Sequence, residues 1–114
     1  VLRQSGRRAE AGKLYRELSA EVRTPQGSEA AYYVIEELFE RGDLDATEKA
    51  VFDYSEREPQ AYWLAKAYLL LGDVYVRKGD NFQARATYQS VADGYSPADD
   101  GIVDEAKERI RKLN

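Results

Sequence analysis

The chain contains no cysteine, no histidine and no methionine among its 114 residues. Without cysteine it can form neither disulfides nor thiolate metal sites. Without histidine it lacks the commonest general base and the commonest transition-metal ligand. These absences remove most of the side chains from which an active site is built. We therefore expect a non-catalytic protein with no cofactor and no metal, and we assign no catalytic residue.

The sequence also lacks long apolar runs and an excess of positive charge. A charged residue interrupts every stretch that approaches membrane-spanning length, so we expect no membrane insertion. The net charge of −4 argues against a nucleic-acid partner, which requires a basic surface. Ten acidic and three basic residues lie between positions 28 and 60, so the acidity is concentrated in one part of the chain.

What the sequence does contain is helical periodicity. The stretch 61–79 is apolar on nearly every side when plotted at helical pitch, which predicts a buried helix. Gly72 lies in its middle, where glycine costs about 1 kcal/mol relative to alanine. A close approach of the next helix explains that choice, and Ala84 is the small residue that we expect against Gly72. The next helix should turn Phe82, Tyr88, Val91 and Tyr95 inward together with Ala84.

The residues at fixed spacing in these two helices resemble the tetratricopeptide repeat. They are, in order, Tyr68, Leu71, Gly72, Tyr75, Gly79, Ala84, Tyr88 and Pro97. The family's pattern is W-x2-L-G-x2-Y, then A-x3-F and a closing proline, with tyrosine here in place of the tryptophan and the phenylalanine. Residues 60–97 are thus interpreted as one repeat. Its period is longer than the roughly 34 residues of the standard repeat, because the first helix is longer.

Weaker copies of the pattern precede this repeat. Residues 28–59 repeat the glycine and the proline as Gly42 and Pro59, but Ile35 and Thr47 replace the small pair. Residues 6–22 are similar to the second helix of a repeat whose first helix is missing. Together with the start at Val1, this leads us to expect the C-terminal end of a longer bacterial array.

The last segment differs from the others. Residues 99–113 have one apolar stripe and are charged elsewhere, with Glu105–Arg109 and Glu108–Lys112 at the favourable i,i+4 spacing. Such a helix at the end of a stack is a solvating cap. The predicted fold is a single all-α domain over 1–114, a right-handed superhelix of about six antiparallel helices without strands. The alternative is an ordinary helical bundle.

Local signals predict where the helices begin. Ser28 is a plausible N-cap, and the spacing of Asp45 and Glu48 is that of a capping box. Gly42, just after residue 41, is a helix stop signal.

The resemblance implies that the first helices of successive repeats line a concave groove that binds a peptide or another protein. The residues that helical phase places on that side are Glu29, Tyr32, Tyr33, Glu36, Glu40, Lys66, Leu69, Leu70, Asp73 and Arg77. Their carboxylates favour a basic partner through steering and selectivity. The alternative interpretation is that Tyr32 and Tyr33 pack against neighbouring helices and that the glutamates are solvated. Trp63 is assigned to the core.

One mechanism of the family is excluded. Some members clamp a partner's terminal carboxylate with lysine and asparagine, and the matching positions here hold Tyr32 and Glu36, of which the second would repel a carboxylate. A different class of function is a structural one, in which residues 6–22 mediate self-association into a homo-oligomer and the groove stays empty. The composition leaves the compartment open, while the stretched period and the YQSVADGYSP ending resemble arrays of bacterial envelope proteins and favour the periplasm over the cytoplasm.

Overall fold

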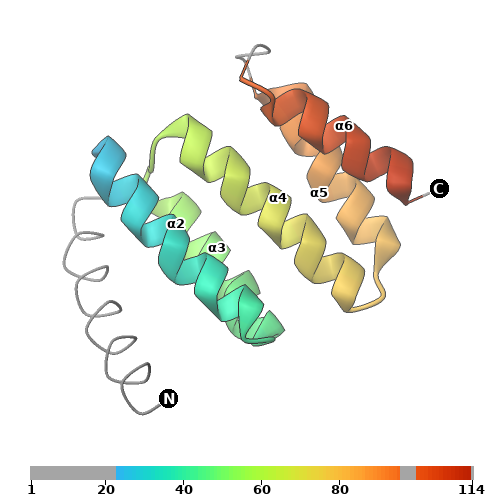
Figure 1. Cartoon of the computed structure of the whole chain (residues 1–114), viewed down its shortest axis with the longest axis horizontal. Coiled ribbons are helices and arrows are strands. Elements are labelled where there is room, and N and C mark those ends of the chain that lie inside the picture. The colour runs from blue at the N-terminus through green and yellow to red at the C-terminus, as the bar shows by residue number, and fades with distance from the viewer. Residues whose placement is uncertain (1–22, 96–99, 114) are drawn as a thin grey trace.

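The computed structural model describes residues 23–95 and 100–113, and this part of the chain forms five α-helices and no strands. They are α2 (Pro25–Glu40), α3 (Leu44–Glu56), α4 (Ala61–Arg77), α5 (Asn81–Gly94) and α6 (Ile102–Lys112) (Figure 1). The all-α prediction is thereby confirmed. The helix expected at residues 6–22, which would be the sixth, lies outside the described residues.

The five helices form two layers. Figure 1 shows α2, α4 and α6 side by side in front, all running in the same direction, with α3 and α5 behind them. Each of the other four described helices contacts α4, whereas α3 and α5 do not contact each other. The long helix predicted to be buried is therefore the centre of the described structure.

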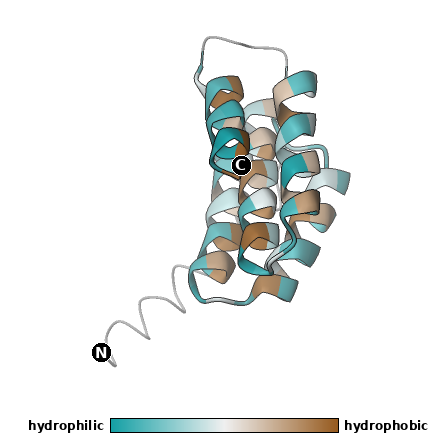
Figure 2. Ribbon diagram, turned by 90° about the vertical axis from the view of Figure 1, so that its right-hand side faces the viewer, coloured by the Kyte–Doolittle hydropathy of each residue, from teal (hydrophilic) through white to brown (hydrophobic). Residues whose placement is uncertain are grey.

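The core follows the periodicity of the helices. Figure 2 shows hydrophilic and hydrophobic segments alternating along the helices, the pattern of elements that are apolar on one side. The buried side chains of α4 are Ala65, Ala67, Leu69, Leu70, Leu71, Val74 and Tyr75. Burial of one leucine contributes about 1.5–3 kcal/mol, so these residues account for much of what holds α4 in place.

Gly72 is the point of closest approach between α4 and α5, but Ala84 is not the residue that fills it. A Cβ built on Gly72 would lie 2.2 Å from the ring of Tyr88, and its three nearest atoms all belong to that ring. Ala84, one turn earlier on α5, is itself fully buried. The missing side chain thus makes room for the Tyr88 ring, and the contact between Gly72 and Ala84 stays a prediction.

The start of α2 differs from the prediction. The helix begins at Pro25 and its N-cap is Thr24, whose hydroxyl accepts a hydrogen bond from the Gly27 amide at 2.9 Å. Proline is favoured at the first helical position because its fixed φ suits a helix. A backbone N–H at this position would have no partner within the helix, so nothing is lost by its absence. Ser28 is therefore not the N-cap but lies inside the first turns of the helix.

Ser28 is fully buried and joins three helices instead. Its carbonyl accepts a hydrogen bond of 2.6 Å from the Tyr54 hydroxyl at the end of α3. Its own hydroxyl accepts a bond of 2.9 Å from the backbone amide of Gln60, the N-cap of α4. Burial raises the pKa of the Tyr54 phenol to about 12, although the bond to Ser28 acts in the opposite direction.

Asp45 and Glu48 do not form a capping box. The helix α3 follows Asp43 and has no side-chain cap, while both carboxylates bind the Lys78 ammonium, at 2.5 and 2.9 Å. Glu48 also accepts a hydrogen bond of 2.8 Å from the Tyr75 hydroxyl. The hydrogen bonds from Lys78 and Tyr75 lower the pKa of Glu48, so its carboxylate stays charged. The ion pair between Lys78 and Glu48 connects α3 to the end of α4.

Two further predictions on side chains are corrected. Phe82 was expected inside but is 83% exposed in the first turn of α5. On α6 the Glu105–Arg109 pair forms as predicted, with 2.6 Å between the charged atoms, while Glu108 pairs with Arg111 rather than Lys112. Spacings of three and four residues both bring side chains together on a helix, so the sequence did not distinguish these two partners.

Candidate functional site

Seven of the ten candidate groove residues border a single cavity of about 280 Å³. They are Tyr32, Glu36, Glu40, Lys66, Leu69, Leu70 and Asp73. The first three belong to α2 and the others to α4, and α6 completes the wall with Glu105 and Arg109. The cavity thus lies where the three parallel helices of the front layer meet.

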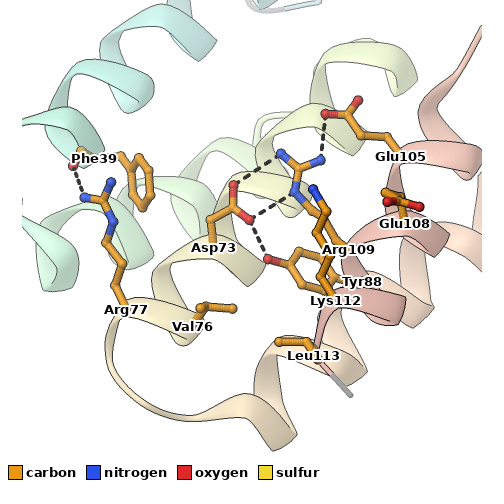
Figure 3. Close-up of a pocket in the computed structure, with 10 residues that line it drawn as sticks. All are labelled: Phe39, Asp73, Val76, Arg77, Tyr88, Glu105, Glu108, Arg109, Lys112 and Leu113. Atoms are coloured by element: carbon orange, nitrogen blue, oxygen red, sulfur yellow. Dashed lines mark hydrogen bonds and ion pairs between the residues drawn. The ribbon is translucent and has the colours of Figure 1, made fainter.

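The three remaining candidates lie outside this cavity. Glu29 and Tyr33 lie one turn apart in the first half and at the middle of α2, and the Tyr33 hydroxyl donates a hydrogen bond of 3.3 Å to the Glu29 carboxylate. Tyr33 is 37% exposed. Arg77 borders a neighbouring cavity of about 660 Å³ between the ends of α4 and α6 (Figure 3). Phe39, Asp73, Glu105 and Arg109 line both cavities, so the two are continuous.

The inner end of the smaller cavity is formed by buried side chains. The exposed fractions are only 6% for Tyr32, 3% for Leu69 and 7% for Leu70. These side chains therefore form the wall of the cavity and do not project into solvent. The Tyr32 hydroxyl donates a long hydrogen bond of 3.4 Å to Glu36. Burial, helped by the nearby Glu36 carboxylate, raises the pKa of Tyr32. The phenol therefore stays neutral and acts as a donor.

An aromatic cluster flanks the cavity at the middle of α2 and the start of α4. The ring centroids of Tyr32 and Trp63 are 5.5 Å apart, those of Tyr33 and Trp63 6.0 Å, and those of Tyr62 and Trp63 5.1 Å. The Lys66 ammonium lies 5.6–5.7 Å from the centroids of Tyr32, Tyr62 and Trp63. Such cation–π contacts contribute about 0.5–1 kcal/mol at exposed sites. Trp63 is half-buried and forms the centre of this cluster.

An ion pair between α4 and α6 lies where the two cavities join. Arg109 donates from Nε to Asp73 Oδ1 at 3.0 Å and from Nη2 to Oδ2 at 3.3 Å, a two-bond arrangement that fixes the orientation of both groups. Its Nη1 donates to Glu105 at 2.6 Å. The Tyr88 hydroxyl of α5 also donates to Asp73 (Figure 3). One aspartate therefore joins three helices.

The environment of this network holds its charges in place. Burial disfavours the charged guanidinium, but the hydrogen bonds to Asp73 and Glu105 outweigh it and raise the pKa of Arg109. Burial and the bond to Asp73 also raise the pKa of Tyr88. Arg109 is thus permanently charged and Tyr88 permanently neutral at ordinary pH. Both carboxylates beside Arg109 are compensated.

Arg77 is bound at the edge of the larger cavity by a different arrangement. Its guanidinium carbon lies 4.1 Å from the centroid of the Phe39 ring, and Nη1 donates to the Phe39 carbonyl at 3.4 Å. Figure 3 shows this side chain reaching from α4 back to α2. Arg77 therefore stacks on an aromatic ring of the neighbouring helix.

Sequence reasoning missed the contribution of α6. Glu105 and Arg109 were recognised as an i,i+4 pair but were treated as part of a solvating cap. In the sequence, these two residues lie opposite the apolar stripe of α6. Because α2, α4 and α6 run parallel in one layer, that side of α6 faces Asp73. Phe39 was missed because it directly precedes Glu40 in the chain and so has a different helical phase from the residues chosen for the groove.

Among residues 23–95 and 100–113 there is no group of three or more acidic, cysteine or histidine side chains arranged to bind a metal. In the same residues no helix combines the length and the apolarity needed to cross a bilayer. No family model matches the chain, and neither a curated protein nor a solved structure shows significant similarity to it.

Proposed function

We propose that this chain is a non-catalytic scaffold of the tetratricopeptide type whose front face, formed by α2, α4 and α6, binds a peptide or protein partner. The residue pattern around Gly72 and Tyr88 supports the family assignment. So does the alternation of the helices, because α2, α4 and α6 run parallel in one layer and α3 and α5 occupy the other. In a superhelix of this type the front layer is the concave side.

The observation that supports binding most directly is the convergence of side chains from three helices on one acidic cavity. Its walls include four carboxylates, those of Glu36, Glu40, Asp73 and Glu105, and two cations, Lys66 and Arg109. The excess of negative charge favours a partner with lysine or arginine. Aromatic rings beside the cavity add the apolar contact area that interface anchors provide.

A library of synthetic peptides of defined sequence and varied net charge tests this proposal. The purified chain should bind basic peptides, and the double substitution Glu36→Lys with Glu40→Lys should abolish that binding while the circular dichroism spectrum is unchanged. The control is Glu56→Lys on α3, in the other layer, which should bind as the wild type does. Peptides that bind all three proteins equally would contradict the proposal.

Sedimentation at two protein concentrations addresses the structural alternative. A monomer that binds peptides supports the scaffold. A dimer that forms with concentration and binds no peptide supports self-association as the function instead.

A further inference from the structure

The carboxylates around the 280 Å³ cavity differ in how their charge is balanced. On the α6 side, Arg109 forms ion pairs with Asp73 and Glu105 at 3.0 and 2.6 Å. On the α2 side, neither Glu36 nor Glu40 forms an ion pair with any residue that the structure describes. The other cation that lines the cavity, Lys66, lies over aromatic rings. Negative charge therefore remains uncompensated at one wall.

We propose that this cavity binds an arginine side chain of the partner, with the guanidinium at Glu36 and Glu40 and the methylene stem against the rings of Tyr32 and Phe39. This inference rests on the proposed peptide-binding function and specifies which residue of the peptide is recognised. The volume lies just below the roughly 300–1,000 Å³ of small-molecule sites, which suits one side chain rather than a whole metabolite.

The same face already binds two of the protein's own arginines by this chemistry. Arg77 stacks on Phe39 with its guanidinium carbon 4.1 Å from the ring centroid. Arg109 forms two hydrogen bonds to one carboxylate, that of Asp73. An aromatic ring and a carboxylate acceptor are the two features that a planar guanidinium recognises. Both are present again at Tyr32 and Glu36, and Arg109, which lines the same cavity, is bound to Asp73 and Glu105 instead.

Lysine meets these requirements less well than arginine. Its ammonium can bind two carboxylates, as Lys78 does with Asp45 and Glu48, but it is a compact, strongly hydrated charge without the planar fork of donors that a guanidinium has. Within the cavity itself, the Lys66 ammonium lies near three rings and forms no described ion pair with Glu36 or Glu40. The structure thus favours arginine over lysine in the ligand.

Lys66 also predicts an effect of opposite sign. Its positive charge borders the cavity and repels an incoming guanidinium. Replacing it by the uncharged Met of similar length should therefore strengthen arginine binding, whereas removing the charge of Glu36 or Glu40 should weaken it. Two substitutions on the same cavity that change affinity in opposite directions are not explained by damage to the fold.

The probe is N-acetyl-arginine N-methylamide, added to ¹⁵N-labelled full chain and followed by NMR. Backbone amide shifts should concentrate at residues 36–40 and 66–70. The citrulline counterpart, which has the same shape but no charge, should cause no saturable shift, and the lysine counterpart should bind more weakly. Raising the salt from about 0.1 to 1 M shortens the Debye length from about 10 to about 3 Å and should weaken binding.

The variants complete the test. Glu36→Gln with Glu40→Gln should weaken arginine binding about tenfold or more, as expected for the loss of charge-assisted hydrogen bonds. Lys66→Met should strengthen arginine binding. Glu56→Gln, which removes one negative charge from α3, should leave it unchanged. Equal shifts with the arginine and citrulline probes, or wild-type affinity in the double Gln variant, would overturn the inference.

The proposed function fails by a different result. If basic peptides bind the front face but their arginines can be replaced by citrulline without loss, the scaffold stands and the arginine site does not. If no peptide binds that face at all while the arginine probe does, the site exists without the scaffold function.

Discussion

The two sides of α4 offer a comparison within one helix. Toward α6 and α5, Asp73 is bound by Arg109 and by Tyr88, so every strong donor and acceptor in that contact has a partner. Toward α2, the cavity is bordered by Glu36 and Glu40, which form no ion pair with the described residues. Carboxylates occur on both sides of α4, but only the one that faces α6 and α5 is bound by side chains of the neighbouring helices. Asp73 therefore takes part in packing, whereas Glu36 and Glu40 are the carboxylates that we propose for ligand binding.

The largest effect on this comparison is expected from Tyr88→Ala. The ring is buried, fills the space left by Gly72 and donates to Asp73. Its loss should lower the free energy of unfolding by about 3–5 kcal/mol, measured by urea denaturation. Phe82→Ala on the same helix is the control, because that side chain is 83% exposed and should change stability little. Similar losses for both variants would mean that α5 does not pack as described.

A smaller loss is expected from Gly72→Ala. The added methyl group would lie 2.2 Å from the Tyr88 ring, so the ring must shift and its bond to Asp73 must weaken. Overpacking of this kind costs about 1–3 kcal/mol. Gly94→Ala is the matched control, since nothing lies within 4 Å of its added Cβ. Denaturation curves should show a loss for the first variant and none for the second, and the reverse order contradicts the contact.

The comparison itself is sharpened by neutralising one carboxylate on each side of α4. Asp73→Asn breaks the paired hydrogen bonds to Arg109, whose side chain is 28% exposed, and should cost about 1–3 kcal/mol. Glu36→Gln should stay within about 0.5 kcal/mol of the wild type, because Glu36 forms no ion pair with a described residue and its hydrogen bond from the Tyr32 hydroxyl is long, at 3.4 Å. Thermal and urea unfolding of both variants measure this difference. Equal losses would show that the two sides do not differ.

The smallest expected effect concerns Glu48, and it depends on pH. The hydrogen bonds from Lys78 and Tyr75 lower its pKa below the usual 4.5, so the folded state favours the charged form. The stabilisation is therefore present above pH 4.5 and is lost as the pH falls through the lower, folded value. The melting temperatures of wild type and Glu48→Gln should differ near pH 7 and converge in acid. A difference that persists at pH 2 would exclude this ion pair as its cause.

Much of the fold was predictable because burial has a helical period. The stretch 61–79, which is apolar on nearly every side, contains the central helix α4, and Gly72 lies where α5 approaches closely. Helix caps were less predictable, because Ser28 and the Asp45–Glu48 pair have the right residue types for caps but are used for bonds between distant helices. Such long-range partners leave no local signal.

On α2 and α4, the resemblance together with helical phase selected ten residues, and seven of them border one cavity. The wall from α6 was not predictable, since a charged helical side reads the same whether it faces water or a neighbouring groove. Leu69 and Leu70 were placed on the groove side without a prediction of their exposure, and they are buried there. Phase gives the direction of a side chain but not the distance of the next helix.

The division of roles on the two sides of α4 is tested most directly by one protein, the double variant Glu36→Gln with Glu40→Gln. Its urea unfolding and its titration with N-acetyl-arginine N-methylamide should be measured on the same sample. We expect the free energy of unfolding of the wild type together with an affinity for arginine reduced about tenfold. A destabilised protein, or one that binds arginine as the wild type does, would contradict the account.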